Sequence, residues 1–357
     1  MVSFQLEQVR KGLEIALGEV PAIISLAIEL APHIDNVQMV SCGTGDSFME
    51  RHLLKFFHKE ARSSFQVSGF KSADYAICPP RRTDNRTLLM VSSVSGATDD
   101  TLLAINAVAD RVRCIVAFTG RAECPIAEKA HKKFNTAGAV DPYSASCLQM
   151  LVFFGKLMEI KEGWGGMQNL LTSLPSFPSA YVAASHESSD LTTNFADQFK
   201  EHDKMLIVST GNVEELGFVI ADCNMVEKLK IFCEFVEASR FFHGPLELVK
   251  SGVPVILILG EDEYRPLMGP VQKFCSEQQA NAVVYDTINM ALPGILYDTR
   301  PLLSPLILRA ALKGLVSALA AAKGSNLDHR HFYGKVKYTV EQHGTFMLGP
   351  YLQVPSN

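Results

Sequence analysis

Two stretches, one in each half of the chain, share the same order of an apolar run, a Thr/Gly turn and a helix. They are VQMVSCGTGDS, which begins at Val37, and KMLIVSTGNVE, which begins at Lys204. Short β-branched runs that alternate with helices are typical of parallel sheets covered by helices. The repetition therefore predicts a pair of duplicated α/β domains.

The remaining strands and helices are expected at regular intervals in both halves. Strands are predicted at 37–42, 87–93, 113–118, 132–136, 204–210, 253–259 and 281–286, and helices at 46–58, 98–110, 125–131, 143–161, 211–230 and 305–324. A chain of 357 residues is long enough for two cores. We expect a first domain with an N-terminal helix over 1–165, a Gly/Ser/Pro-rich linker over 166–195, a second domain over 196–330 and a C-terminal tail over 331–357 that closes on the active site.

Composition restricts the partners and the compartment. The chain is 47% hydrophobic and 20% charged, as in soluble globular proteins, and its net charge is −5. No long Lys/Arg block is present and no stretch approaches the ~18 apolar residues of a membrane span, so neither nucleic acid nor a membrane is an expected partner. The start of the chain is no signal peptide, and eight scattered cysteines form no C-x-x-C motif. We expect a reduced, cytoplasmic protein without a metal site or cofactor.

A turn rich in hydroxyl groups interrupts the first half. The segment VSSVSGATDDT, residues 91–101, places Ser93, Ser95 and Thr98 around Gly96, between an apolar run and a helix. Turn chemistry alone explains such residues, since Ser, Gly and Thr often start helices. A second explanation is a cradle in which hydroxyls and backbone N–H groups bind an anion.

The position of this turn in the chain favours the anion-binding explanation. The segment SCGTGDS, residues 41–47, and the hydroxyl turn both follow strands, and ligands of parallel α/β sheets bind beyond the carboxyl ends of strands. The matching segment of the second half, VPVILILGEDEYRPLM, has acids in place of the hydroxyls. Since neither a Walker lysine nor a G-x-G-x-x-G motif is present, the preferred ligand is a phosphate ester rather than a nucleotide.

Three motifs in this order resemble the sugar isomerase (SIS) family: SCGTGDS, SSVSGATDDTL and FFHGPLEL. The resemblance extends over about residues 30–345. Within the family it is nearest to bacterial fructosamine-6-phosphate deglycases and to the isomerase half of glutamine:fructose-6-phosphate aminotransferase. It implies two tandem SIS domains, each a parallel sheet flanked by helices in a flavodoxin-like α/β/α sandwich. It also implies a homodimer or higher homo-oligomer and a phosphorylated sugar or amino-sugar substrate.

The resemblance also implies the residues that hold the substrate. The hydroxyl turn would bind the sugar 6-phosphate, and the SAS sequence that ends at Ser146 would close over the substrate. Val94 and Ala97 stand where the family often has Gln and Glu, which leaves the phosphate contacts in place and changes those to the sugar chain. The implied phosphate and sugar residues are Gly43, Thr44, Gly45, Ser47, Ser93, Ser95, Thr98, Ser144 and Ser146.

Two further residues match the family's catalytic pair. Glu227 lies sixteen residues before His243 of the HGP motif, as in the aminotransferase. The resemblance implies that Glu227 moves a proton between sugar C1 and C2, and that His243 opens the sugar ring, often from the partner subunit. Lys335 in the tail HFYGKVKY, or its rival Lys337, matches a lysine near the sugar.

The residues around this pair are consistent with those roles. Leu216, Ile220 and Cys223 form one apolar helical stripe on which Glu227 is the next member, so its carboxylate should be desolvated and its pKa raised. The alternative is a glutamate at a helix end, paired with a lysine. His243 lies in a tight Gly-Pro turn, and its alternative is a purely structural histidine.

The parts fit proton transfer between adjacent carbons, which needs a base and stabilisation of an enaminol but no redox group. The aminotransferase itself is not expected, because the SIS pattern starts near residue 36 and residue 2 is valine, not a cysteine nucleophile. The leading hypothesis is a deglycase that cleaves a 6-phosphorylated fructosamine (Amadori) amino acid into an aldose 6-phosphate and a free amino acid. Alternatives are an aldose–ketose or aminosugar-phosphate isomerase or deaminase, and a non-catalytic sugar-phosphate sensor.

Overall fold

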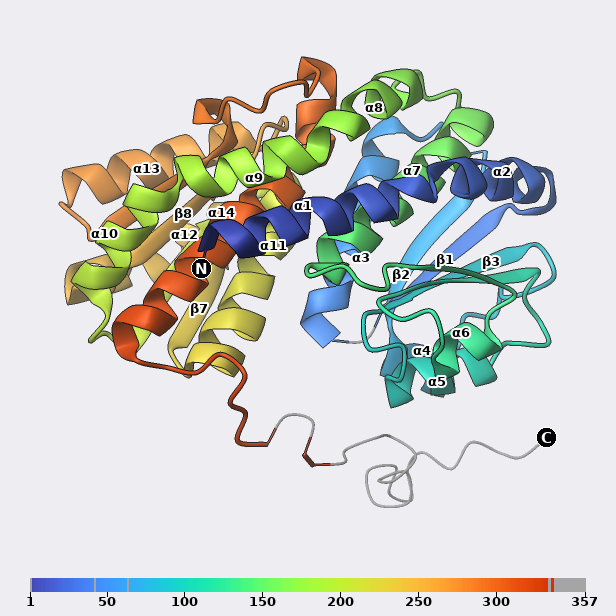
Figure 1. Cartoon of the computed structure of the whole chain (residues 1–357), viewed down its shortest axis with the longest axis horizontal. Coiled ribbons are helices and arrows are strands. Elements are labelled where there is room, and N and C mark those ends of the chain that lie inside the picture. Colours follow the sequence, from blue (N-terminus) through green and yellow to red (C-terminus); the bar gives the residue numbers. More distant parts are fainter. Residues whose placement is uncertain (1, 42, 63, 333–334, 337–357) are drawn as a thin grey trace.

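The computed structural model contains two parallel sheets, one in each half of the chain (Figure 1). It describes residues 2–41, 43–62, 64–332 and 335–336, without the side chains of 2–5, 43–47 and 251. The first sheet consists of β1 (Asn36–Ser41), β2 (Gln66–Lys71), β3 (Thr87–Ser93), β4 (Cys114–Thr119) and β5 (Lys132–Asn135). The second consists of β6 (Lys204–Ser209), β7 (Phe232–Glu237), β8 (Val255–Leu259) and β9 (Ala282–Asp286).

The two sheets have the same topology. The strand orders are β2-β1-β3-β4-β5 and β7-β6-β8-β9, and every pairing is parallel. The order reverses between β1 and β3 in the first sheet and between β6 and β8 in the second. Such reversals create a crevice at the carboxyl ends of the strands. The fold thus provides two equivalent crevices, and the predicted α/β duplication is confirmed.

Helices cover both faces of each sheet. The chain begins with α1 (Val2–Gly18) and α2 (Val20–Leu30), and α3 (Gly43–Glu60) follows β1. The remaining helices are α4 (Ser72–Ile77), α5 (Asp99–Asn106), α6 (Pro125–Lys129), α7 (Pro142–Glu162), α8 (Met167–Ser173), α9 (Phe177–Glu187), α10 (Ser189–Phe199), α11 (Glu214–Val219), the π-helix η4 (Ile220–Leu229), α12 (Ala238–Phe241), α13 (Met268–Glu277) and α14 (Arg300–Lys323). Short 3₁₀ turns join several of them.

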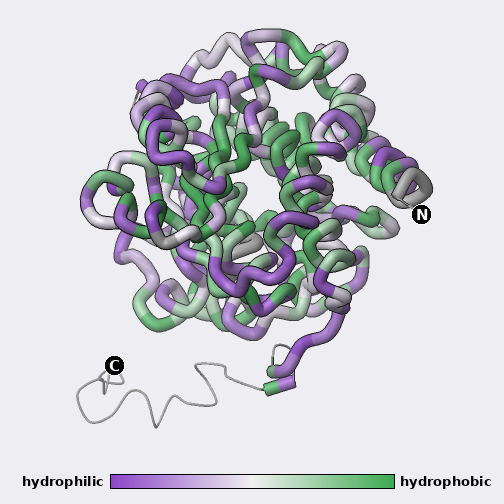
Figure 2. Tube along the Cα trace, turned by 90° about the vertical axis from the view of Figure 1, so that its left-hand side faces the viewer, coloured by the Kyte–Doolittle hydropathy of each residue, from purple (hydrophilic) through white to green (hydrophobic). Residues whose placement is uncertain are grey.

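One large core lies between the sheets. It joins the inner faces of both sheets to α3, α7, α11, η4 and α14, while α4–α6 cover the outer face of the first sheet and α12–α13 that of the second. Hydrophobic segments run through the interior and hydrophilic ones are concentrated outside (Figure 2). The two halves therefore share a middle layer of helices, which brings the carboxyl edge of one sheet close to helices of the other.

The strands β2 and β7 are missing from the sequence-based prediction. Both lie at sheet edges, and only Val67 of β2 and Val236 of β7 are buried. Their other residues are half-buried or exposed, so neither strand has a continuous apolar run. Periodicity therefore gives little signal for either strand.

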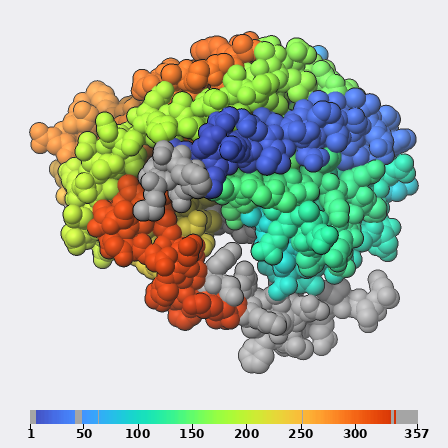
Figure 3. All heavy atoms as spheres, viewed as in Figure 1, coloured from blue at the N-terminus to red at the C-terminus, as the bar shows by residue number. Residues whose placement is uncertain are grey.

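The segment expected as a linker is mostly helical. Residues 167–199 form α8, a 3₁₀ turn, α9 and α10, and the last two pack on α14. The helix α1 runs across α7 and α9 on the outside of the molecule (Figures 1 and 3).

The helix α14 is apolar enough to cross a membrane by length and composition alone. The span that meets this criterion, Tyr297–Lys323, contains a window that is 72% buried within the fold. The expectation that no stretch approaches this composition was wrong for α14. Its apolar side chains pack in the core between the sheets.

Candidate active site

Three hydroxyl groups converge in the turn between β3 and α5. The Oγ of Ser93 lies 2.9 Å from Oγ1 of Thr98 and 3.4 Å from Oγ of Ser95, and the last two are 3.4 Å apart. Ser93 is buried at the end of its strand, Thr98 is half-buried and Ser95 is exposed. The turn thus presents a cluster of hydroxyls on an accessible surface, beside the first N–H groups of α5, as an anion site requires.

The backbone of the turn depends on Gly96. Its φ is +65°, a conformation that favours glycine, and its N–H donates to Ser93 Oγ at 3.1 Å. A Cβ at this position would lie 2.2 Å from Cys124 Sγ. Both the conformation and the lack of space therefore require glycine here.

A small cavity of about 10 Å³ links this turn to the start of α7. Ser93 and Val94 line it on one side, and Tyr143 and Ser146 on the other. The Oγ of Ser146 is buried and has no hydrogen-bond partner among the described residues. Ser144 is directed elsewhere, because its hydroxyl donates to Asp141 at 2.8 Å.

The predicted contacts in SCGTGDS cannot be placed in the same way. Gly43 begins α3 directly after β1, beside the hydroxyl turn at the reversal of strand order. The side chains of Thr44 and Ser47 lie outside the described part of the chain, and so does any contact of Gly45.

Asp141, just before α7, is the centre of a buried charge network. Its carboxylate accepts hydrogen bonds from Ser144 and from Tyr181 Oη at 2.6 Å, and it lies 3.1 Å from Lys313 Nζ and 3.8 Å from Arg309. Burial raises the pKa of Asp141, but Lys313 and Arg309, with the two hydrogen bonds, outweigh burial and hold that pKa well below its usual range. The carboxylate therefore ties α7 to α14.

Arg309 lies between this network and the second half of the chain. It is 8% exposed, its guanidinium lies 5.2 Å from the ring centre of Tyr143, and its Nε has no partner among the described residues. Burial and the charges of Arg309, Arg330 and Lys313 lower the pKa of Lys228, while Glu227 acts in the opposite direction. Lys228 therefore lies close enough to Arg309, Arg330 and Lys313 to feel their charges.

The residues around Arg309, here called the cation group, carry an excess of positive charge. Arg309, Arg330, Lys313 and Lys228 face Glu227, which is 2.7 Å from Arg330, and Asp141, the partner of Arg309 and Lys313. Asp222 also lies in these surroundings, which leaves four cations against three carboxylates. An excess of positive charge in a half-buried place suits an anionic substrate. Tyr143 borders both this cation group and the cavity beside Ser93, so the two features adjoin.

Glu227 lies on η4, where the helix differs from the expected one. From Ile220 to Leu229 the helix is a π-helix, and its buried residues are Ile220, Ala221, Asn224, Met225 and Leu229. This wider turn places Glu227 beside the core rather than on the apolar stripe. Its carboxylate is 24% exposed and paired with Arg330, so the prediction of a desolvated acid on the apolar stripe was wrong. π-helical segments are frequent at functional sites.

His243 lies on the opposite side of the second sheet from Glu227. It follows α12, which packs with Phe241 on the outer face, whereas η4 packs on the inner face. Glu227 also precedes β7 and His243 follows it, so they lie near opposite ends of that strand. One chain does not bring these two residues together, and the imidazole of His243 is exposed.

Lys335 reaches this region only indirectly. Its Nζ donates to the carbonyl oxygen of Arg330, the residue that is paired with Glu227. Its rival Lys337 lies outside the described residues.

The sequence-based predictions did not include Asp141, Arg309 or Lys228. An available signal was the interruption of the apolar run PLILRAALKG by an arginine, because a charge on a buried helix needs a partner. Glu50 was also missed. Burial raises its pKa to about 7, it accepts a hydrogen bond from Ser41 Oγ at 2.6 Å, and it lies below the carboxyl edge of the first sheet.

Removal of two hydroxyls tests the cradle. In Ser95→Ala/Thr98→Ala we expect affinity for sugar 6-phosphates to fall about 10²- to 10⁴-fold, because two charge-assisted hydrogen bonds of ~1.5–3 kcal/mol each are lost. Affinity for the unphosphorylated sugars should change little. Isothermal titration calorimetry with fructose 6-phosphate and fructose gives both values. An equal loss for both ligands would argue against a phosphate site.

The fold and this site define an α/β protein with two tandem SIS domains and an anion-binding turn in the first. In fold and in sequence the chain is similar to SIS-family phosphosugar-processing enzymes. No family model matches it.

Comparison with known proteins supports this assignment. The chain is 26% identical over 337 residues to the agropine synthesis conjugase of Rhizobium rhizogenes, covering 91% of this chain and 93% of that protein. It is 24% identical over 310 residues to the fructosamine deglycase FrlB of Bacillus subtilis (strain 168), covering 85% and 93%. A solved phosphosugar isomerase structure from Bacillus subtilis matches with a TM-score of 0.80 at 22% identity, covering 94% of this chain and 100% of that one.

Proposed function

We propose that the protein is a deglycase that cleaves a 6-phosphorylated fructosamine amino acid into an aldose 6-phosphate and a free amino acid. The observation that carries the proposal is the junction at Tyr143, where the hydroxyl turn adjoins the cation group that contains Glu227. In this proposal the hydroxyl turn anchors the phosphate on one side, and Glu227 is the carboxylate on the other. The similarity to a fructosamine deglycase supports the same reaction.

The reaction needs one base that acts at two adjacent carbons. After ring opening by His243, the carboxylate of Glu227 removes a proton from C1 and leaves an enaminol between C1 and C2. Return of the proton to C2 gives an imine at C1. Water adds to this imine and expels the amine, which yields the aldose 6-phosphate and the free amino acid.

Three cations contribute to this chemistry. Arg330, paired with Glu227, holds the carboxylate in place. Arg309 and Lys228 offer positive charge where the enaminol oxygen gains negative charge. Their roles are to position and to stabilise, so none of the three is the proton carrier.

The site also needs a second subunit. Because Glu227 and His243 lie on opposite faces of the sheet in one chain, we propose that the histidine is supplied by the partner in a homodimer. The exposed position of His243 agrees with such a contact.

The reverse reaction is a second candidate. The relative from Rhizobium rhizogenes is named as a conjugase, and an enzyme that catalyses cleavage through an enaminol catalyses the reverse condensation through the same states. In that direction the chain would join an amine to a sugar. One assay starts from the fructosamine 6-phosphate and the other from the sugar phosphate and the amine. The amounts of product that the two assays yield decide between cleavage and condensation.

A substrate panel tests the proposal. The protein is incubated with fructosamine 6-phosphates of several amino acids, with fructose 6-phosphate and with glucosamine 6-phosphate, and products are followed by mass spectrometry. We expect aldose 6-phosphate and amino acid from one or more fructosamine 6-phosphates, and much less from unphosphorylated analogues. Turnover of fructose 6-phosphate or glucosamine 6-phosphate alone would support an isomerase or deaminase. Binding without turnover on the whole panel would support a sensor.

A further inference from the structure

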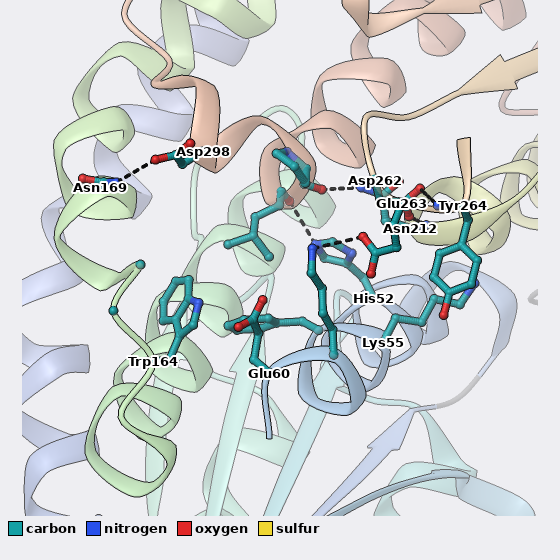
Figure 4. Close-up of a pocket in the computed structure, with 16 residues that line it drawn as sticks. His52, Lys55, Glu60, Trp164, Asn169, Asn212, Asp262, Glu263, Tyr264 and Asp298 are labelled. Carbon is teal, nitrogen blue, oxygen red and sulfur yellow. Dashed lines mark hydrogen bonds and ion pairs between the residues drawn. The ribbon is translucent and has the colours of Figure 1, made fainter. Parts of the chain in front are cut away.

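A second cavity, of about 330 Å³, lies at the carboxyl edge of the second sheet (Figure 4). Its walls come from α3, from the segment around Trp164, from the turns after β6 and β8, and from the start of α14. Trp164 and Glu60 lie on one side and Asp262 and Tyr264 on the other (Figure 4). A cavity of this volume accommodates a small molecule.

The position of this cavity is equivalent to that of the hydroxyl turn. Asn212 follows β6 and Asp262 follows β8, so the cavity lies where the strand order of the second sheet reverses. The fold thus forms a crevice at both reversals. The residues differ, since acids of the GEDE sequence replace the hydroxyls of the first half.

Phosphate does not suit the second crevice. The backbone N–H of Asn212, which a bound anion would need, already donates to the carboxylate of Asp262. A Cβ at Gly211, whose φ is +64°, would lie 2.3 Å from that carboxylate. The protein's own acid therefore occupies the anion position.

Negative charge is in excess around the cavity. The lining contains Lys55 and Lys59, and both are already paired, at 2.5 Å with Glu214 and at 3.0 Å with Glu263. The lining carboxylates without a lysine partner are Glu60, Asp262 and Asp298. Within the described residues, Glu60 forms no side-chain hydrogen bond or ion pair, and Asp298 only accepts from Asn169 at 3.5 Å. Asp262 also accepts from the backbone N–H groups of Asn212 and Tyr264, and a bound cation would balance the remaining negative charge.

The buried polar atoms point to the same chemistry. His52 is 3% exposed and lines the cavity, and its Nε2 donates to the carbonyl oxygen of Leu302 at 2.9 Å. Burial lowers the pKa of His52 to about 4, so Nδ1 is a neutral acceptor at neutral pH. Neither this atom nor Oδ1 of Asn212 has a donor among the described residues. These two buried atoms are acceptors without a partner, and an ammonium group supplies only donors.

An aromatic wall completes the site. Trp164, the only tryptophan of the chain, packs edge-to-face on Phe56 with ring centres 4.8 Å apart, and Tyr264 is 49% exposed on the opposite side. Aromatic faces attract cations and cover apolar stems. The combination of acids and rings is suited to an organic cation rather than to a bare metal ion.

We propose that this cavity binds a small molecule with a primary ammonium group on an apolar or hydroxylated body, held by Glu60, Asp262 and Asp298 against Trp164. The site is separate from the hydroxyl turn and does not depend on the deglycase reaction. It gives the protein a second ligand, different in charge from its phosphorylated substrate.

The fluorescence of Trp164 tests the proposal without any activity assay. Cyclohexylmethylamine, which is protonated at neutral pH, is titrated against the full-length protein, with the uncharged cyclohexylmethanol and inorganic phosphate as matched probes. We expect a saturable change in emission with the amine, and at least tenfold weaker effects with the alcohol and with phosphate. Equal binding of amine and alcohol, or tighter binding of phosphate, would overturn the proposal.

Two variants locate the site. Glu60→Gln should weaken amine binding about tenfold, since one carboxylate of the three is lost. Asp262→Asn should do the same, and its circular dichroism spectrum shows whether it is folded. The control is Glu277→Gln on α13, an exposed glutamate paired with Lys273, which should bind the amine as the wild type does. Unchanged affinity in folded Glu60→Gln would count against the site, whatever the outcome of the substrate panel.

Discussion

Glu227→Gln is expected to lower the turnover of the fructosamine 6-phosphate by about 10²- to 10⁴-fold, the contribution typical of a general acid–base residue. Glutamine keeps the size of the side chain and an oxygen for Arg330, so the fold and the affinity for the sugar phosphate should be retained. The loss should therefore appear in kcat and leave KM almost unchanged. In D₂O, the wild type should place deuterium at C2 of the product, and the variant should not.

Glu50 is the other carboxyl to examine, because burial raises its pKa to about 7, which suits a general base. If Glu50→Gln abolishes deuterium exchange while Glu227→Gln retains it, Glu50 is the proton carrier. The matched control is Glu277→Gln, which removes an exposed glutamate far from both.

Mixing two inactive variants tests the origin of His243. If the histidine comes from the partner, a dimer of one Glu227→Gln chain and one His243→Asn chain holds one intact site. Random mixing of chains then restores about a quarter of wild-type activity, since half of the dimers are mixed and each has half its sites. If both residues act within one chain, no activity returns.

Asp141→Asn is expected to destabilise the protein by about 3–5 kcal/mol, the usual cost of removing one partner from a buried ion pair. The side chain of Asp141 is 2% exposed, and its loss leaves Arg309 and Lys313 without their carboxylate. Urea denaturation at pH 7 measures the change. The control is Asp35→Asn, which removes an exposed pair with Arg86 and should cost less than about 1 kcal/mol.

The pH dependence gives a second readout for Asp141. Because its pKa is lower in the folded than in the unfolded state, its contribution is complete above the unfolded pKa of about 3.9 and is lost as pH falls below that value. The difference in stability between wild type and Asp141→Asn should therefore be constant from about pH 7 to 5 and shrink towards pH 3. A difference below 1 kcal/mol at pH 7, or one that grows on acidification, would contradict the assignment.

Strand ends and turns were the most predictable parts of this chain. The strand that ends at Ser93 and the turn that follows it could be predicted from the sequence. An apolar run followed by Ser, Gly and Thr is typical of a buried strand that ends in a turn. The edge strands β2 and β7 and the π-helix η4 were not predictable in this way. Their residues are half-exposed or follow a wider helical turn, so neither a period of 2 nor one of 3.6 describes them.

The duplicated α/β architecture and the hydroxyl turn could be predicted, since both depend on the order of residues within one strand, turn and helix. Which groups act together depends instead on tertiary packing. It joined Asp141 to Arg309, gave Glu227 an arginine partner, and placed His243 on the opposite face of the sheet from Glu227. It also formed a second cavity from α3 and the loops of the other sheet. These contacts link residues that are far apart in the chain. They depend on how the shared helical layer packs, and local periodicity carries no information about that packing.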